Sequence, residues 1–346
     1  MKRVLKILYI GIFSLTILAG IVPYIPAYFF PLLQFLPFLS VLFLVLHVVA
    51  WFVFRKKWAG KIVAIIGIGV CLWIFSKEYR YTLPTRPPSK NIKVMAFNVQ
   101  NFQFERDNID SLILLLKMEQ PDIVCLQEFR IGMIPSEDGK RFNDKTEKLI
   151  GAKLGFPHYA FTAEKTHLVG TAYFSRYPMT RLDTIYMDKK KTNSGVIMTF
   201  RTPMGELGVA NIHLTSYHLP QDKRNHFILR KLNDVVLQIS RIMPKQMEFA
   251  MVCREKIQKY GHPIIVVGDM NAMPHTSVIQ TVQGDLKDSF LEKGMGWGFS
   301  YPLEKYWGIR IDYQFHSKQI TAWEYRTLNY VHFSDHYPTV GVYSMP

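Results

Sequence analysis

The chain has 346 residues, a length sufficient for one large domain and an appendage, and its formal net charge is +15. Residues 1–90 contain eleven Lys and Arg residues and one acidic residue, whereas residues 91–346 contain thirty-one basic and twenty-six acidic residues. The positive excess therefore belongs mainly to the first segment. The remaining chain is only mildly basic, so its charge gives no support for a dedicated DNA-binding face.

Three apolar runs lie at the start of the chain, at Ile7–Val22, Phe29–Phe54 and Ile62–Phe75. A membrane-spanning helix needs about 20 apolar residues, and the third run reaches that length only with its flanking residues. We expect three transmembrane helices, so that residues 1–80 form a membrane anchor. A cleaved signal peptide is the alternative for the first run, because Leu18-Ala19-Gly20 places small residues near its end.

Basic residues indicate how the anchor is oriented, because loops rich in Lys and Arg stay in the cytoplasm. Three basic residues precede the first run, and four more lie at residues 55–61, between the second and third runs. We therefore expect a multi-pass protein of the inner membrane, with the rest of the chain on the periplasmic side. If the third run does not cross, the domain is cytoplasmic. Prolines 84, 87 and 88 predict a semi-rigid tether at residues 81–90, before a domain of residues 91–346.

Within that domain, the most informative stretch is Ile264–Asn271. Four β-branched apolar residues predict a strand that is buried on both faces. Gly268 then breaks the pattern, and Asp269 and Asn271 follow two residues apart. A plain turn has this composition too. The alternative is that the carboxylate and the carboxamide point into one crevice at the end of the strand.

Other predicted strands also end in polar residues. Residues 92–99 predict a strand that carries Asn98 at its end, and residues 123–128 predict a buried strand that closes on Glu128. A buried carboxylate is costly unless it is paired or bound to a cation, so Glu128 is a candidate functional residue. Residues 207–214 end with Asn211 and His213, which share one face because strand side chains repeat every two residues.

Two more candidates lie near the end of the chain. Asp312 is inside a predicted strand at residues 310–315, and Asp335 and His336 are adjacent in the stretch Ser334–Pro338. Adjacent side chains diverge, so one can hold a metal ion or water while the other handles a proton. The three cysteines form no C-x-x-C pair, which argues against a zinc site or a disulfide framework. Two buried free thiols at Cys125 and Cys253 are the favoured interpretation, with one bridge between them as the alternative.

Taken together, six stretches in this order resemble the endonuclease/exonuclease/phosphatase family, which includes deoxyribonuclease I, exonuclease III-like repair enzymes, inositol polyphosphate 5-phosphatases and neutral sphingomyelinases. They are Phe97-Asn98, Gln127-Glu128, Asn211-Ile212-His213-Leu214, Gly268-Asp269-Met270-Asn271, Arg310-Ile311-Asp312-Tyr313 and Ser334-Asp335-His336-Tyr337-Pro338. The last two particularly resemble membrane-anchored bacterial members. The resemblance implies a two-sheet α/β sandwich of the deoxyribonuclease I-like fold, preceded by transmembrane helices, with the site at one sheet edge.

The resemblance also implies a set of roles. Glu128, with help from Asn98 and Asp335, is expected to hold Mg²⁺ (or Mn²⁺), an ion that prefers oxygen ligands and keeps several waters. His336, oriented by Asp312, is the expected general acid/base.

The other residues of the motifs are expected to act on water and substrate. By resemblance, Asp269 and Asn271 orient the attacking water and the scissile phosphate. His213 contacts the phosphate and shares in proton transfer, and Asn211 supports this substrate-binding site.

These residues predict a membrane-anchored phosphoesterase that cleaves phosphodiester bonds. A divalent cation would offset the charge that develops at phosphorus, and positioned carboxylate and imidazole groups would supply the proton steps. The substrate is predicted to be nucleic acid, as for a nuclease, or a phospholipid or its headgroup. The alternative is a non-catalytic, membrane-tethered binding domain that keeps the fold. No protein partner is predicted.

Overall fold

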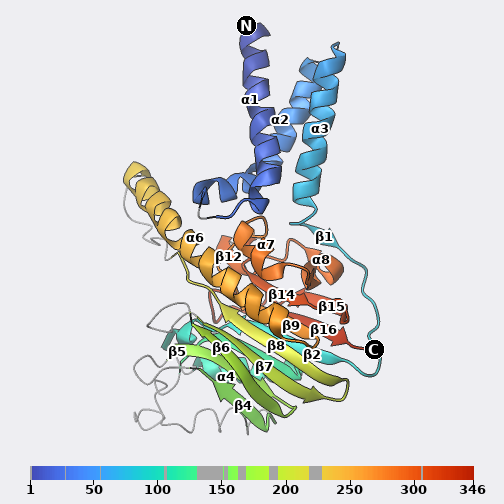
Figure 1. The fold of residues 1–346 in the computed structure, drawn as a ribbon, viewed down its shortest axis with the longest axis vertical. Coiled ribbons are helices and arrows are strands. Elements are labelled where there is room, and N and C mark those ends of the chain that lie inside the picture. Colours follow the sequence, from blue (N-terminus) through green and yellow to red (C-terminus); the bar gives the residue numbers. More distant parts are fainter. Residues whose placement is uncertain are drawn as a thin grey trace. The chain divides into compact units, whose positions relative to one another are not determined.

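The computed structural model describes the chain apart from residues 1, 28, 55, 105–106, 131–150, 152–154, 163–168, 187–193, 218–227 and 305–306. Its helices and strands are drawn in Figure 1, and the chain forms two compact units. The first comprises Met1–Tyr79, Ser216–Ala250 and Ala272–Val282, and the second comprises Arg80–Thr215, Met251–Asn271 and Gln283–Pro346. The chain therefore returns twice to the unit that holds its amino-terminal helices. The domain boundaries expected from the sequence remain a proposal.

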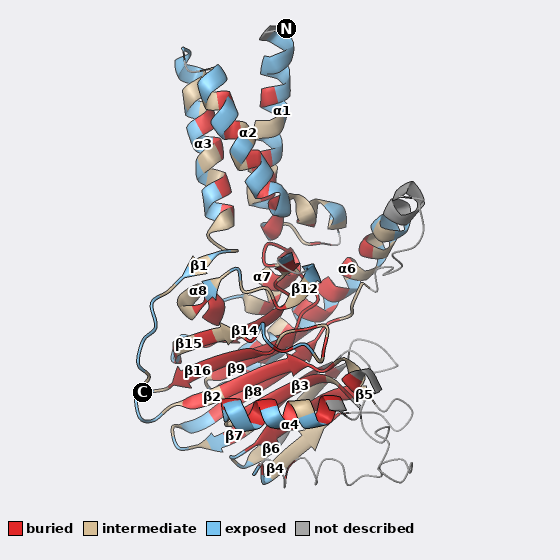
Figure 2. Ribbon diagram, turned by 180° about the vertical axis from the view of Figure 1, so that it is seen from behind, coloured by how far each residue is buried: buried red, intermediate tan, exposed pale blue. Residues whose placement is uncertain are grey.

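The first unit begins with three long apolar helices, α1 (Lys2–Ile21), α2 (Ser40–Val53) and α3 (Trp58–Phe75). Two 3₁₀ helices, η1 (Val22–Tyr24) and η2 (Pro31–Leu39), lie between α1 and α2. Three stretches, Arg3–Tyr24, Pro31–Val53 and Trp58–Phe75, are long and apolar enough to cross a membrane. Most of their large side chains are exposed, whereas the strands of the second unit are largely buried (Figure 2).

Polar side chains fasten the helices of the first unit. His47 of α2 is buried, with Nδ1 3.2 Å from the Tyr9 hydroxyl and Nε2 2.9 Å from the Thr16 hydroxyl of α1. The Gln34 amide donates to the carbonyls of Val22 and Ile25, and its oxygen accepts the Ser277 N–H at 2.8 Å. Gln34 thereby joins η2 to the start of α7 (Ser277–Gln283). The long helix α6 (Ile228–Lys259) runs from the first unit into the second.

The second unit is built on two six-stranded sheets. One has the order β15 (Thr321–Thr327), β16 (Thr339–Ser344), β2 (Ile92–Asn98), β3 (Ile123–Arg130), β5 (Val169–Ser175) and β4 (His158–Phe161). The other has the order β10 (Lys287–Asp288), β14 (Asp312–His316), β9 (Ile264–Asp269), β8 (Gly205–His213), β7 (Ser194–Thr202) and β6 (Met179–Tyr186). Only the neighbours β2–β3 and β8–β9 are parallel among the strand pairs that the structure describes.

A core between the sheets combines apolar side chains of both. Ile92, Val94 and Ile123 of one sheet pack in the same buried cluster as Val209 and Val267 of the other. A second cluster joins the first sheet to α4 (Asp107–Glu119). This arrangement confirms the predicted two-sheet α/β sandwich with apolar helices before it. The cysteines are buried and free, so the disulfide alternative is not adopted.

Shorter elements complete the second unit. The residues expected to form a tether pack on this unit, because β1 (Arg80–Tyr81) pairs with β11 (Met295–Gly296) and the Thr85 hydroxyl donates to the Trp323 carbonyl. The helix α8 (Ser289–Lys293) and the 3₁₀ helix η3 (Gln100–Phe104) also belong here. A small hairpin joins β12 (Tyr301–Glu304) to β13 (Trp307–Ile309).

The two parallel pairs carry the polar residues to one edge of the sandwich. The register places Asn98 beside Gln127 in one sheet and His213 beside Asp269 in the other. Gly268 makes the close pairing of β8 and β9 possible, because its φ is 132° and a Cβ there would lie 2.0 Å from the Ile212 carbonyl oxygen. The carboxyl ends of these strands therefore converge, as the sequence predicts.

Candidate active site

Asp269 lies at the centre of the converging residues. Its side chain is 1% exposed, and Oδ2 accepts hydrogen bonds from the Asn98 and Asn271 amides, each at 3.0 Å. Oδ1 accepts the Asn271 backbone N–H at 2.8 Å, and the Asn271 amide also donates to the Leu214 carbonyl. Asn271 has a φ of 45°, a left-handed conformation that asparagine tolerates better than most residues. These contacts hold the two residues of the Gly-Asp-Met-Asn stretch in a single orientation.

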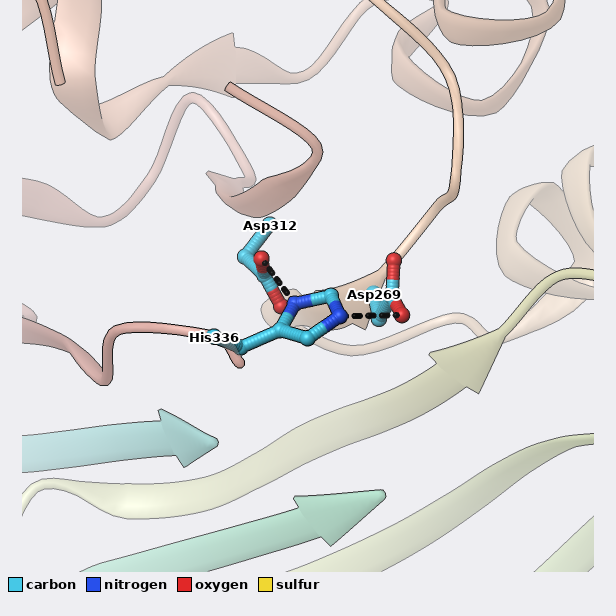
Figure 3. A group of neighbouring side chains, drawn as sticks. All are labelled: Asp269, Asp312 and His336. Atoms are coloured by element: carbon cyan, nitrogen blue, oxygen red, sulfur yellow. Dashed lines mark hydrogen bonds and ion pairs between the residues drawn. The ribbon is translucent and has the colours of Figure 1, made fainter. Parts of the chain in front are cut away.

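Asp312, His336 and Asp269 form a line of interacting side chains (Figure 3). His336 Nδ1 lies 2.9 Å from Asp312 Oδ2, and His336 Nε2 lies 3.6 Å from Asp269 Oδ2. Asp312 is aligned by the pairing of β14 with β9, which sets it opposite Asp269. Its backbone N–H donates to the Ser300 hydroxyl at 2.9 Å. The imidazole is therefore fixed at one nitrogen, and the other nitrogen faces the centre of the site.

The charges of this line change the proton affinities of its members. Burial lowers the pKa of His336, but the Asp312 and Asp269 carboxylates outweigh burial and raise the pKa to about 10. Burial raises the pKa of Asp269, and the neighbouring His336 opposes that rise. An imidazole next to buried carboxylates is charged at neutral pH, so His336 has a proton to give.

His213 lies on the other side of Asp269. Its Nε2 is 3.8 Å from Asp269 Oδ2 and 3.6 Å from Glu128 Oε1. Asn211, two residues earlier, is fully buried, and its Oδ1 accepts the Gln127 amide at 2.6 Å while its own amide donates to the Leu126 carbonyl. Asn211 therefore joins β8 to β3 behind the site. Its expected role in substrate binding remains a prediction.

Glu128 and Asp335 form the half-buried part of the site. Their side chains are 27% and 31% exposed. Glu128 lies within an irregularity in the pairing of β3 with β5 and has a φ of 50°, and its Oε1 accepts the Asn98 amide at 3.1 Å. Burial raises the pKa of Asp335; the charge of His336 opposes this rise, and the charge of Glu128 adds to it. Two carboxylates that disfavour each other's charge are stabilised by a cation.

This carboxylate pair fits a metal ion better than the Asp312–His336 line does. Asp269, Asp312 and His336 offer ligand atoms within 4.8 Å of one another. Their proximity is already explained by the hydrogen bond at His336 Nδ1 and the ion pair at Nε2. Glu128 and Asp335 offer only oxygen atoms and lie partly open to water, which suits Mg²⁺ or Mn²⁺.

Asn98 contributes to the same region through its amide nitrogen. That nitrogen donates to both Glu128 and Asp269, while Oδ1 accepts the Gln100 backbone N–H at 3.0 Å. In this conformation Asn98 bridges the two carboxylates, and metal binding through Oδ1 would need another arrangement. Ligation of a metal ion by Asn98 therefore remains a prediction.

Several residues of the site were not identified from the sequence. The Gln100 amide donates to Asp335 Oδ2 at 2.9 Å, and the Ser334 hydroxyl donates to the Asn98 carbonyl at 2.7 Å. The Tyr301 ring contacts the His336 ring edge to face, with 5.0 Å between their centroids. Ser334 lies inside a recognised stretch, so attention to that hydroxyl could have found it. Gln100 carries no comparable signal, whereas Tyr301 ends a Gly- and aromatic-rich stretch that could have indicated the wall of a substrate cleft.

Comparisons with known proteins agree on one family. The sequence model of the Endonuclease/Exonuclease/phosphatase family matches residues 95–336. No curated protein sequence gives a match.

Similar solved structures cover most of the chain. An endonuclease/exonuclease/phosphatase from Beutenbergia cavernae is 16% identical, with a TM-score of 0.54 over 74% of this chain and 72% of that one. One from Bacteroides vulgatus is 13% identical, with a TM-score of 0.52 over 75% and 100%. The mannosyl-6-phosphatase of Bacteroides thetaiotaomicron is 15% identical, with a TM-score of 0.50 over 73% and 100%. At these identities the likeness shows the fold.

Proposed function

The chain belongs to the endonuclease/exonuclease/phosphatase family and is a phosphoric ester hydrolase, and from this premise we propose that it is membrane-anchored, depends on a divalent metal ion and cleaves phosphodiester bonds. The observation that carries this proposal is the line of Asp312, His336 and Asp269, joined by one hydrogen bond and one ion pair, beside the Glu128–Asp335 pair. It supports a proton donor and a cation site at the same edge of the sandwich.

Glu128 and Asp335 are the residues that would hold Mg²⁺ or Mn²⁺. When bound, the ion offsets the negative charge that develops on the phosphate oxygens. The amide of Asn98 keeps Glu128 and Asp269 side by side, because it donates to both at 3.1 and 3.0 Å. The all-oxygen donor pair and its partial exposure support this assignment.

Proton transfer is assigned to His336. Asp312 holds Nδ1 at 2.9 Å and thereby leaves the proton on Nε2 directed to the centre of the site. The raised pKa keeps that proton in place at neutral pH, so His336 would protonate the leaving oxygen. General acid catalysis of this kind contributes about 10²–10⁴-fold to the rate.

Asp269, Asn271 and His213 would bind the reacting groups. Asp269 Oδ2 faces both histidines, which supports a role in orienting the attacking water. His213 Nε2 lies between the Asp269 and Glu128 carboxylates and would contact the phosphate once these charges are neutralised. Asn271, held by Asp269, is assigned to the scissile phosphate.

Two substrate classes fit this chemistry, nucleic acid and phospholipid or its headgroup. Phosphomonoesters must also be assayed, because one of the proteins of similar fold is a mannosyl-6-phosphatase. The test is hydrolysis by the full chain in detergent, with Mg²⁺, Mn²⁺ or EDTA, on bis-p-nitrophenyl phosphate, p-nitrophenyl phosphate, DNA, RNA and mixed lipid micelles. His336→Ala should lose turnover, and His332→Ala, at an exposed position four residues away, should keep it.

The result separates the possible outcomes. Turnover with metal that disappears in EDTA and in His336→Ala would support the proposal, and the preferred substrate would distinguish nuclease, lipid phosphodiesterase and monoesterase. Undiminished turnover in His336→Ala would contradict the role given to His336. Absence of turnover from the folded chain on every substrate would favour the binding-domain alternative.

The membrane location is a proposal of the same kind. Three helices suited to span a membrane and the basic residues at their ends support an inner-membrane protein with a periplasmic catalytic unit. A reporter enzyme that is active only in the periplasm, fused after Pro346, should be active. Inactivity of this fusion, with activity of a matching cytoplasmic reporter, would place the unit in the cytoplasm.

A further inference from the structure

Exposed apolar side chains are grouped on one part of the second unit. Met295, Trp297, Leu303 and Trp307 are 57%, 39%, 52% and 53% exposed, and we call these four residues the rim surface. Isolated exposed apolar residues are ordinary in proteins, but a group that includes two tryptophans marks an interaction surface. Tryptophan is also enriched where proteins meet the headgroup region of a membrane.

The four residues come from a short part of the sequence that contributes to two separate two-stranded sheets, β1–β11 and β12–β13. Met295 is in β11, and Trp297 stacks on Phe299 with 5.7 Å between ring centroids. A Cβ built on Gly308 would lie 3.1 Å from the Phe299 Cβ, so Phe299 packs closely on the β12–β13 hairpin. In the same hairpin, Trp307 of β13 pairs with Glu304 of β12, the residue that follows Leu303. The rim surface therefore combines residues of β11, β12 and β13 with Trp297, which lies between β11 and β12, and Phe299 links the two parts.

The same hairpin is joined to the candidate active site. Tyr301 of β12 places its ring on His336. The residue before it, Ser300, accepts the Asp312 backbone N–H at its hydroxyl and the Tyr337 backbone N–H at its carbonyl. The start of the β12–β13 hairpin is therefore in direct contact with the residues assigned to proton transfer.

The chain itself indicates what the rim surface meets. β11 pairs with β1, where Met295 lies opposite Tyr81, and Tyr81 is also exposed. Only residues 76–79 separate β1 from the last residue of α3, a candidate membrane span. Fully extended, this link measures at most ~18 Å. β1, which pairs with β11, is therefore connected to a candidate membrane span by a link of only four residues.

The positive charge of the segment that links α3 to the second unit also favours a membrane as the partner of the rim surface. Residues 76–90 contain four basic residues and one acidic residue. Each Lys or Arg near an anionic membrane surface adds electrostatic attraction to that surface. A basic tether beside exposed tryptophans has the composition of a segment that lies on a lipid surface.

We propose that the rim surface inserts into the headgroup region of the bilayer that holds the anchor helices, so that the candidate active site works against the lipid surface. The proposal rests on the membrane anchor of the proposed function and is independent of the reaction assigned to the site. The partner is a phospholipid bilayer with anionic headgroups.

The test uses the full chain in vesicles of phosphatidylcholine and phosphatidylglycerol. Leu303→Cys carries an environment-sensitive nitrobenzoxadiazole fluorophore, and Met118→Cys, an exposed apolar position on α4 (64%), is the matched control. Trp307→Cys is a second rim position. The native cysteines are buried, and labelled wild type supplies the blank. Equal thermal transitions establish that the labelled variants are folded.

Spin-labelled lipids in the vesicles should quench the fluorophore at residues 303 and 307 several-fold more than at residue 118. Equal quenching at all three positions, with protein that floats with the vesicles, would overturn the rim-surface proposal and leave the anchor intact. Failure of every variant to float would overturn both. A fluorescence change at residue 303 on addition of short single-stranded DNA, without quenching by lipid, would identify nucleic acid as the occupant and refute membrane insertion.

Discussion

Replacement of Asp312 by Asn isolates the charge that holds His336 protonated. The variant keeps the size of the side chain but removes the acceptor charge 2.9 Å from Nδ1, in a pair whose side chains are only 3% and 6% exposed. A hydrogen bond to a charged partner contributes about 1.5–3 kcal/mol, and one pKa unit corresponds to about 1.4 kcal/mol. The pKa of His336 should therefore fall by roughly 1–2 units. Asp269 and Asp335, at 3.6 and 4.0 Å from Nε2, still hold it above that of a free imidazole.

The assay is the pH dependence of kcat/KM on a phosphodiester with the metal ion saturating. If His336 is the general acid, the rate falls where its proton is lost, so the alkaline limb of the wild type should shift towards acidic pH in Asp312→Asn. The rate at the optimum should fall by about 10²-fold, the lower part of the general acid range. An alkaline limb that stays in place, with the variant folded and metal-saturated, would refute the role given to the Asp312–His336 pair.

Three further outcomes follow from the structure. Glu128→Gln should raise the Mg²⁺ concentration for half-maximal activity at least about tenfold, whereas Glu255→Gln, at an exposed position on α6, should leave it unchanged. Gly268→Ala should lower the thermal stability by about 1–3 kcal/mol, because its Cβ would meet the Ile212 carbonyl oxygen at 2.0 Å; Gly205→Ala, also at positive φ but with open space around it, should cost less. The folded-state pKa of His336 is raised, so its stabilising contribution is complete below the unfolded value of 6.5 and is lost as pH rises to about 10. The difference in Tm between wild type and His336→Asn should accordingly shrink across that interval, and a constant difference would contradict the raised pKa.

Hydrophobic pattern and strand ends allowed much of the fold to be predicted. The run at residues 264–267 lies in β9, whose residues are all buried, and the polar residue that follows it reaches the site as expected. Asn98 and His213 are the last residues of β2 and β8, as predicted, whereas β3 continues for two residues beyond Glu128. This worked because the carboxyl ends of neighbouring parallel strands meet at one edge, a constraint that depends on order in the chain and not on side-chain detail.

The contacts between the strand ends could not be predicted in the same way. The Asn98 amide reaches Asp269, 171 residues later, and Gln100 reaches Asp335, 235 residues later. Such pairs depend on rotamers and on backbone conformations such as the positive φ of Gln100. The sequence also did not predict that residues 216–250 and 272–282 belong to the unit of the apolar helices. Their sequence pattern does not indicate which part of the chain they pack against.

Asp269 connects the two halves of the site, and this position gives the sharpest discrimination among the roles. Its Oδ2 accepts the amide that also holds Glu128, and it lies 3.6 Å from the Nε2 of His336. Asp269→Asn removes the charge that both halves share, so it should raise the metal requirement and also move the alkaline limb towards acidic pH.

The double variants of Asp269→Asn with Glu128→Gln and with Asp312→Asn test this sharing, because residues in one network show non-additive effects of about 0.5–3 kcal/mol. Glu128→Gln with Asp312→Asn should be close to additive, since no direct contact joins them among the described residues. If the coupling free energy between Glu128 and Asp312 is as large as that of either residue with Asp269, the metal-binding and proton-transfer residues are coupled by a route that does not pass through Asp269. Additivity of all three pairs would mean that Asp269 does not connect metal binding with proton transfer.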